Sequence, residues 1–189
     1  MDADWSVELG ADDPALEFPW TSPEGTQGYV DLSKGMSGLD WVPEAVEHAP
    51  LRSFLIGINA KTSPWMSVKC DVWSDGDISE AEEIYGCTMR MCSYVDVIRR
   101  QGQERFSFEQ HEGWVKSAVE RLRRFPEGPA LAELVVRRCY YHQEENSEES
   151  RAGFYVTVYA FGYGDEDTAK WRWKGCLDRV SHALTTLQP

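Results

Sequence analysis

The sequence predicts an α+β fold of two layers, in which an antiparallel sheet of four to five strands has two long helices packed on one face. Residues 65–125 and 131–187 each read strand, strand, helix, and the strands alternate apolar and polar side chains, as strands with one wet face do. At 189 residues, the chain fits one domain with a real apolar core. We therefore expect an extended acidic N-terminal arm over residues 1–37, and a single α+β domain over residues 38–189 that begins with short helices.

The arm is the most acidic part of the chain. Residues 1–50 carry eleven acidic side chains and one basic side chain, within a total formal charge of −13. Large apolar side chains are also frequent there: Trp5, Leu9, Leu16, Phe18 and Trp20. Because disordered tails are usually poor in such side chains, we expect the arm to lie on the domain, with a short strand at Tyr29–Leu32.

Two short helices and a pair of strands are predicted next. The helices are separated by a kink at Pro50 and have apolar residues at helical spacing: Leu39, Val42, Val46, Leu51, Phe54, Leu55 and Ile58. From Trp65 the period becomes two, with Met66, Val68, Cys70 and Val72 on one side and Ser67, Lys69 and Asp71 on the other. An acidic connection over residues 77–83, with one helical turn, leads to a second strand that alternates in the same way up to Val97.

A long helix, another pair of strands and a last helix complete the predicted fold. Ser107 and Gln110 form a capping box for a helix that ends near Pro126. Residues 131–142 and 153–164 are predicted strands, joined by an acidic loop over residues 143–152. Asp165 or Asp167 caps the last helix. The apolar stripe of that helix keeps three- and four-residue steps: Ala169, Trp173, Cys176, Leu177, Val180, Leu184 and Leu187.

The composition argues against several classes of function. An acidic chain repels phosphate groups, so neither nucleic acid nor an anionic membrane surface is an expected partner. The sequence has no apolar run of the length that a membrane helix needs, and its start lacks the basic and apolar regions of a signal peptide. None of its five cysteines is spaced as Cys-x-x-Cys, which is typical of reduced thiols. We expect a cytoplasmic protein.

No catalytic residue, metal site or cofactor is predicted. Cys87 and Cys92 lie five residues apart and Cys139 and His142 three apart, and an odd separation puts side chains on opposite faces of a strand. His111 begins a sequence like the zinc-protease helix motif but has no second histidine four residues later. Buried thiols and a hydrogen-bonded core histidine are the favoured interpretations.

The densest group of polar side chains able to bind a ligand lies on the strand at residues 131–142. Arg138, Tyr140 and His142 share one face of it, and across the sheet they can meet Arg90 and Tyr94. A guanidinium matches a carboxylate with two hydrogen bonds, so these residues are the predicted site for an anion or another small ligand. The alternative is that they form cross-strand pairs on a solvated face.

Three tryptophans are candidates for contact with a partner or for cover by the N-terminal arm. Trp65 and Trp73 fall on the polar side of the first strand, and Trp171 falls off the apolar stripe of the last helix. Exposed tryptophan, tyrosine and arginine dominate binding energies at protein interfaces. The first functional hypothesis is therefore a non-enzymatic binding or accessory protein of bacterial cytosol, which acts through an aromatic-rich surface on a protein partner or on its own copy as a homodimer.

The alternative hypothesis is an enzyme or small-ligand binder with a pocket around Arg90, Arg138, Tyr140 and His142. For the first hypothesis there is also a resemblance in the order of elements. Over residues 39–187 that order resembles the small acidic chaperones of type III secretion, which bind protein segments. The resemblance matches no motif, and what it implies about function is analogy of fold alone.

Overall fold

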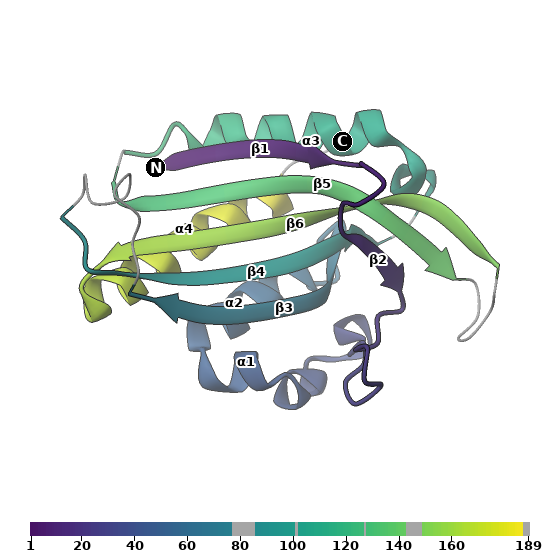
Figure 1. The fold of residues 1–189 in the computed structure, drawn as a ribbon, viewed down its shortest axis with the longest axis horizontal. Coiled ribbons are helices and arrows are strands. Elements are labelled where there is room, and N and C mark those ends of the chain that lie inside the picture. The colour runs from purple at the N-terminus through teal and green to yellow at the C-terminus, as the bar shows by residue number, and fades with distance from the viewer. Residues whose placement is uncertain (77–85, 101, 127, 143–148, 187–189) are drawn as a thin grey trace.

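The computed structural model describes residues 1–76, 86–100, 102–126, 128–142 and 149–186. These residues form one six-stranded sheet, with helices behind it (Figure 1). The strands are β1 (Asp2–Glu8), β2 (Ala15–Phe18), β3 (Trp65–Asp75), β4 (Met89–Arg99), β5 (Ala130–His142) and β6 (Ser150–Gly164). The α-helices are α1 (Pro43–Glu47), α2 (Ala49–Ile58), α3 (Phe108–Leu122) and α4 (Glu166–Thr185), and the 3-10 turns are η1 (Leu32–Lys34), η2 (Met36–Trp41) and η4 (Gln103–Phe106).

The sheet is mixed rather than purely antiparallel, and its order is β1-β5-β6-β4-β3 with β2 also paired to β5. The antiparallel strands β3, β4, β5 and β6 are those predicted, so the α+β class is confirmed. The predicted strand number and polarity were wrong, because β1 and β2 in the expected arm pair in parallel with β5. No strand forms at Tyr29–Leu32, where the Tyr29 backbone N–H donates to Trp20 O at 2.8 Å.

One face of the sheet, here called the helix side, packs against α2, α3 and α4 in a common apolar core. Every second residue of each central strand takes part, as the pleat requires: Val95 and Val97 of β4, Leu134 and Val136 of β5, Val156 and Val158 of β6. Helix α4 lies close against β6, where Gly162 has no side chain to hold it away. The last helix therefore sits directly on the middle of the sheet.

The opposite face, here called the open face, is covered only in part. Leu16 of β2 packs there with Tyr141 and Tyr155 in a smaller second core, to which Phe18 and Trp20 add. A row of aromatic rings with neighbouring centroids 6.1–6.4 Å apart crosses the same face: Trp73, Tyr94, Tyr159, Phe161 and Tyr163. The N-terminal segment adjoins Tyr94 and Tyr159 of this row, whereas Trp73 at its end is 36% exposed.

A β-bulge between Ser67 and Lys69 changes which residues of β3 face the helices. Before the bulge, Trp65 lies in the helix-side core and Met66 in the open-face core; after it, Cys70 packs on the helix side. A bulge inserts one extra residue and so reverses the alternation. The prediction that Met66 and Cys70 share a face was wrong for this reason.

The two long helices begin where the sequence predicts. Ser107 Oγ accepts a hydrogen bond from the Gln110 N–H at 3.3 Å, and Asp165 Oδ1 accepts one from the Thr168 N–H at 2.8 Å. The predicted stripe of α4 is buried from Ala169 to Leu184. The helical turn predicted at residues 77–83, most of the predicted loop at 143–152, and Leu187 lie outside the described residues.

Ser107→Ala is expected to lower the free energy of unfolding by about 1 kcal/mol, because it leaves a helix N-terminal N–H without its acceptor. Urea denaturation measures this change. Ser53→Ala is the matched control, since the Ser53 hydroxyl donates to Ala49 O within α2 and caps nothing. Equal effects of the two substitutions would show that the cap contributes no stability.

Candidate functional site

The structure divides the predicted ligand residues between the two faces of the sheet. Arg138, Tyr140 and His142 continue the helix-side row of β5, whereas Arg90 and Tyr94 lie on the open face of β4. On β5 the even-numbered residues face the helices, as Leu134 and Val136 do. On β4 the odd-numbered residues face the helices, as Val95 and Val97 do, so the even-numbered Arg90 and Tyr94 face away from them. The prediction that these side chains form one site is therefore wrong.

The charged members of this set have partners within the chain. Arg138 Nη2 donates to Leu9 O at 2.7 Å, and His142 Nε2 lies 2.6 Å from Glu17 Oε2. On the other face, Arg90 Nη2 donates to Asp75 Oδ2 at 2.8 Å. Arg138 and His142 thus fasten the N-terminal segment to β5, which is a structural task.

The predicted partner-binding tryptophans do not form one surface. Trp65 is 1% exposed and its Nε1 donates to Leu184 O at 3.2 Å, so its expected exposure was wrong; the bulge puts it on the helix side. Trp73 is 36% exposed on the open face, and Trp171 is 73% exposed on α4. Sequence reasoning missed Trp41 at the end of η2, which is 81% exposed.

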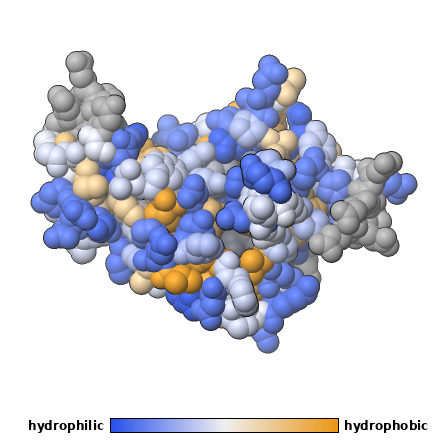
Figure 2. Space-filling model, turned by 60° about the horizontal axis from the view of Figure 1, so that its bottom comes forward, coloured by the Kyte–Doolittle hydropathy of each residue, from blue (hydrophilic) through white to orange (hydrophobic). Residues whose placement is uncertain are grey.

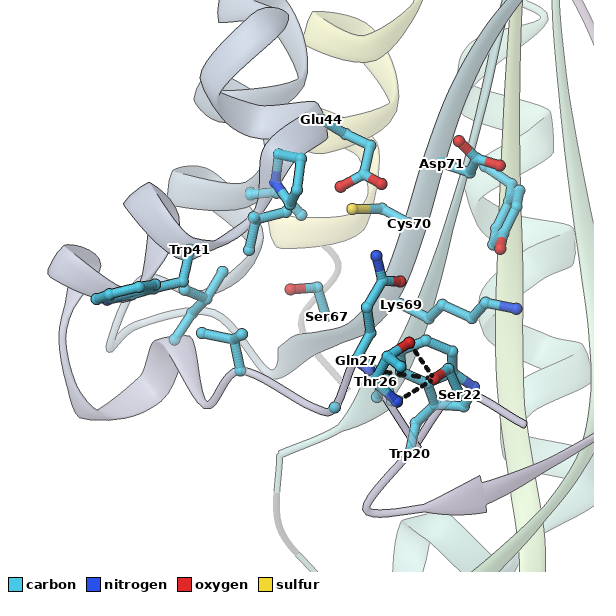
Figure 3. A pocket seen from close by; sticks show the side chains of 18 residues that line it. Trp20, Ser22, Thr26, Gln27, Trp41, Glu44, Ser67, Lys69, Cys70 and Asp71 are labelled. Atoms are coloured by element: carbon cyan, nitrogen blue, oxygen red, sulfur yellow. Dashed lines mark hydrogen bonds between the residues drawn. The ribbon is translucent and has the colours of Figure 1, made fainter. Parts of the chain in front are cut away.

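A groove of about 500 Å³, here called the edge groove, follows the outer edge of β3. It lies between the 20–30 segment and the η2–α1 segment, and six of its lining residues are Trp20, Gln27, Trp41, Glu44, Lys69 and Asp71. In Figure 3, Cys70 points toward Glu44 while Lys69 and Asp71 point to the other side of β3. Figure 2 shows this side of the molecule, where the surface is hollowed and apolar residues gather beside the hollow.

The floor of the edge groove is an unpaired strand edge. Within the described part of the chain, β3 pairs with β4 and with no strand on its other side. The Val72 N–H donates to Asp71 Oδ1 at 2.7 Å, an acceptor that belongs to β3 itself and not to β4. Along an antiparallel strand, the backbone groups of alternate residues point to the same side, so every second residue of β3 directs its backbone groups away from β4. The groove therefore offers backbone hydrogen-bonding groups to an occupant.

A second hollow, of about 240 Å³ and here called the inner cavity, lies on the open face beneath residues 14–20. Pro14, Ala15, Leu16 and Trp20 of the covering segment line it. The strands β3 to β6 contribute the remaining lining residues: Lys69, Tyr94, Asp96, Arg137, Tyr155 and Tyr159. Trp20, Lys69 and Tyr94 also line the edge groove, so the two hollows adjoin.

Asp96 is the buried charged group of the inner cavity, with 6% of its surface exposed. Thr157 Oγ1 donates to its Oδ1 at 2.7 Å, and Arg137 Nη1 donates to Thr157 Oγ1 at 2.9 Å. Burial raises the pKa of the Asp96 carboxyl to about 6, against the lowering effects of the Thr157 hydroxyl, Lys69 and Arg137. A displaced pKa in a cavity is a feature of functional sites.

The sequence holds a signal for this site. Asp96 stands in the run Val95-Asp96-Val97-Ile98, where a buried carboxylate among apolar strand residues is costly unless it is paired and hydrogen-bonded. The sequence does not indicate that Arg137, and not its neighbour Arg138, lies near Asp96, because the face of β5 that meets Asp96 depends on the β5–β6 register. Local spacing does not determine that register.

Other candidate chemistries find no support in the described residues. They contain no group of three or more His, Cys, Asp or Glu side chains able to hold a metal ion, and none of their helices is long and apolar enough to cross a membrane. Comparisons with protein-family models, curated proteins and solved structures gave no match to this chain. The function is therefore argued from the edge groove and the inner cavity.

Proposed function

We propose that this protein is a non-enzymatic cytoplasmic binding protein that holds an extended segment of a protein partner along the outer edge of β3. The observation that carries the proposal is the unpaired edge of β3 at the floor of a groove of about 500 Å³. A peptide that adds a strand to a sheet edge gains affinity from main-chain hydrogen bonds and specificity from pockets for alternate side chains.

Trp20 and Trp41 both line the edge groove, and the Trp41 ring, which points away from β3 in Figure 3, is 81% exposed and therefore available to a partner. Natural sheets usually protect an open edge, so an open edge beside an exposed tryptophan favours a binding role. Among the described residues that line the groove, Glu44 and Asp71 are acidic and Lys69 alone is basic, in a chain of net charge −13. This charge favours a segment that carries basic residues among β-branched or aromatic ones.

Trp41→Ala is expected to weaken peptide binding about tenfold or more, since truncation of an anchoring tryptophan commonly removes that much affinity. Peptides selected by display against the purified protein supply the probes, and fluorescence polarisation measures their affinity. Trp171→Ala is the matched control, because Trp171 is also exposed but lies on α4. Selection of no peptide, or equal losses in both variants, would contradict the proposal.

Backbone N-methylation tests the pairing itself. Methyl groups on the alternate peptide nitrogens that face β3 should abolish binding, whereas those on the intervening nitrogens should leave it nearly unchanged. A uniform response along the peptide would exclude strand addition. Light scattering of the free protein decides whether the occupant is a second copy. If the protein is a dimer and Trp41→Ala dissociates it, the occupant of the edge groove is a second copy of the chain and not another protein.

A further inference from the structure

Lys69 and Asp96 face each other across β3 and β4 in direct register, yet they do not form an ion pair. The Lys69 ammonium instead lies over two aromatic rings, with Nζ 5.2 Å from the centroid of Trp20 and 5.5 Å from that of Tyr94. Directly opposed charges of opposite sign normally attract each other across a strand pair. Both side chains line the inner cavity, which therefore separates a cation from a carboxylate.

Among the described residues that line the inner cavity, Arg137 is the third charged residue beside Lys69 and Asp96, and it is neutralised by Glu8. Arg137 Nε donates to Glu8 Oε2 at 2.7 Å, and its Nη1 donates to Thr157 Oγ1 at 2.9 Å and to the Tyr159 hydroxyl at 3.2 Å. Arg137 and Glu8 thus form a closed pair. What the cavity offers a ligand is one negative group, Asp96, and one positive group, Lys69.

The hydrogen bonds of Asp96 leave room for a ligand. Its Oδ1 accepts from Thr157 Oγ1, and within the described part of the chain no side chain or backbone group donates to its Oδ2. A buried carboxylate is stable only with hydrogen bonds and compensating charge. An ammonium group at Oδ2 would supply both.

We propose that the inner cavity binds a small zwitterion of the α-amino acid class, with its ammonium group on Asp96 and its carboxylate on Lys69. A lone cation would meet the Lys69 charge, and a lone anion would meet the Asp96 charge, so a zwitterion suits the pair best. The volume of about 240 Å³ lies below the roughly 300–1,000 Å³ of drug-sized pockets and fits a molecule of this class.

The walls of the inner cavity indicate an apolar ligand side chain. Leu16, Tyr94, Tyr155 and Tyr159 present aliphatic and aromatic surface to the cavity. The raised pKa of Asp96 agrees with the assignment, because burial outweighs the lowering effects of Lys69 and Arg137, and a ligand ammonium would offset that cost of burial. This inference is independent of peptide binding in the edge groove, and either can fail without the other.

Leucine, isoamylamine and isocaproate test the proposal, because the last two lack one charged group each. By isothermal titration calorimetry near pH 7, leucine should bind at least about tenfold more tightly than either truncated probe. Asp96→Asn should weaken leucine binding about tenfold or more. Lys69→Met should weaken leucine binding to a similar extent but leave the affinity for isoamylamine unchanged or higher.

The same titrations hold the results that would overturn the proposal. These are the absence of heat from leucine, phenylalanine and valine alike, equal affinity for leucine and isoamylamine, or full leucine binding by Asp96→Asn. Circular dichroism and a thermal melt establish that each variant is folded. Asparagine still accepts the Thr157 hydrogen bond, so Asp96→Asn tests the charge and not the packing. Peptide binding by Asp96→Asn shows separately whether the edge groove is intact, because Asp96 does not line that groove.

Discussion

Gly162→Ala is expected to lower the free energy of unfolding by about 3 kcal/mol or more. A Cβ at position 162 would lie 2.2 Å from Trp173 N and 2.3 Å from Ala169 O. Both atoms belong to the backbone of α4, so no side-chain rotation can relieve the overlap, and the helix as a whole would have to move off the sheet. Overpacking usually costs about 1–3 kcal/mol, and a backbone clash lies at or above the upper end of that range.

Gly175→Ala is the matched control for this prediction, because it makes the same chemical change within α4. A Cβ at position 175 would meet no atom within 4 Å. Alanine is the better helix former by about 1 kcal/mol, so the control should be neutral or stabilising. Urea denaturation of both variants measures the two changes. A loss of less than about 1 kcal/mol in Gly162→Ala would mean that α4 does not approach β6 as closely as the structure has it.

The sequence predicts the elements that depend on local chemistry. The caps at Ser107 and Asp165 and the stripe of α4 follow from hydrogen bonding and helical spacing, and the structure confirms them. β1 also had a local signal, since Ala3, Trp5 and Val7 alternate with polar residues. Its parallel pairing with β5 had none, because which strand edge a segment joins is decided by contacts more than a hundred residues away.

The candidate sites were harder to predict because they depend on whether the odd- or the even-numbered residues of each strand face the helices. One inserted residue at the bulge moves Trp65 into the core, and the register through β6 turns Arg137, not Arg138, toward Asp96. A shift of one residue reverses the face of a whole strand segment. Spacing within a strand predicts which residues share a face, but it does not predict which face of the neighbouring strand they meet.

The second large expected effect is on the pH dependence of the free energy of unfolding, to which Asp96 and His111 contribute with opposite signs. His111 is fully buried, its Nδ1 lies 2.9 Å from Ser107 O, and burial lowers its pKa from 6.5 to about 4. Between pH 6.5 and about 4 the unfolded state therefore binds more protons, and stability falls as the pH falls. Over about two and a half pKa units the loss of stability is about 3 kcal/mol.

Asp96 contributes in the opposite sense because its folded pKa, about 6, lies above the unfolded value near 3.8. Between these values the folded state binds more protons, so stability rises as the pH falls, again by about 3 kcal/mol at most. The charges facing Asp96 are Lys69 of β3 and Arg137 of β5, and those facing His111 are Arg99 of β4 and Glu104 of η4. In the wild type the two contributions nearly cancel from about pH 6 to pH 4.

Single variants should separate the contributions of Asp96 and His111 to the pH dependence of stability. The free energy of unfolding of Asp96→Asn should equal that of the wild type near pH 4. Near pH 7 it should be higher than that of the wild type by up to about 3 kcal/mol, because the variant buries no charge at this position. His111→Phe should gain on the wild type as the pH falls from about 6.5 to 4. Phenylalanine suits the rings of Trp65, Trp114 and Phe154 around it, and Ser107 O keeps the bond from the backbone N–H of residue 111.

Urea denaturation at half-unit steps from about pH 4 to pH 7.5 yields the two difference curves against the wild type, and these should slope in opposite directions. Carboxylates elsewhere titrate equally in all three proteins and drop out of the differences. Parallel curves would mean that neither group is buried with a displaced pKa. An Asp96→Asn curve that lies at zero near pH 7 would mean that the wild-type carboxylate is already compensated, and it would remove the electrostatic support for an ammonium ligand in the inner cavity.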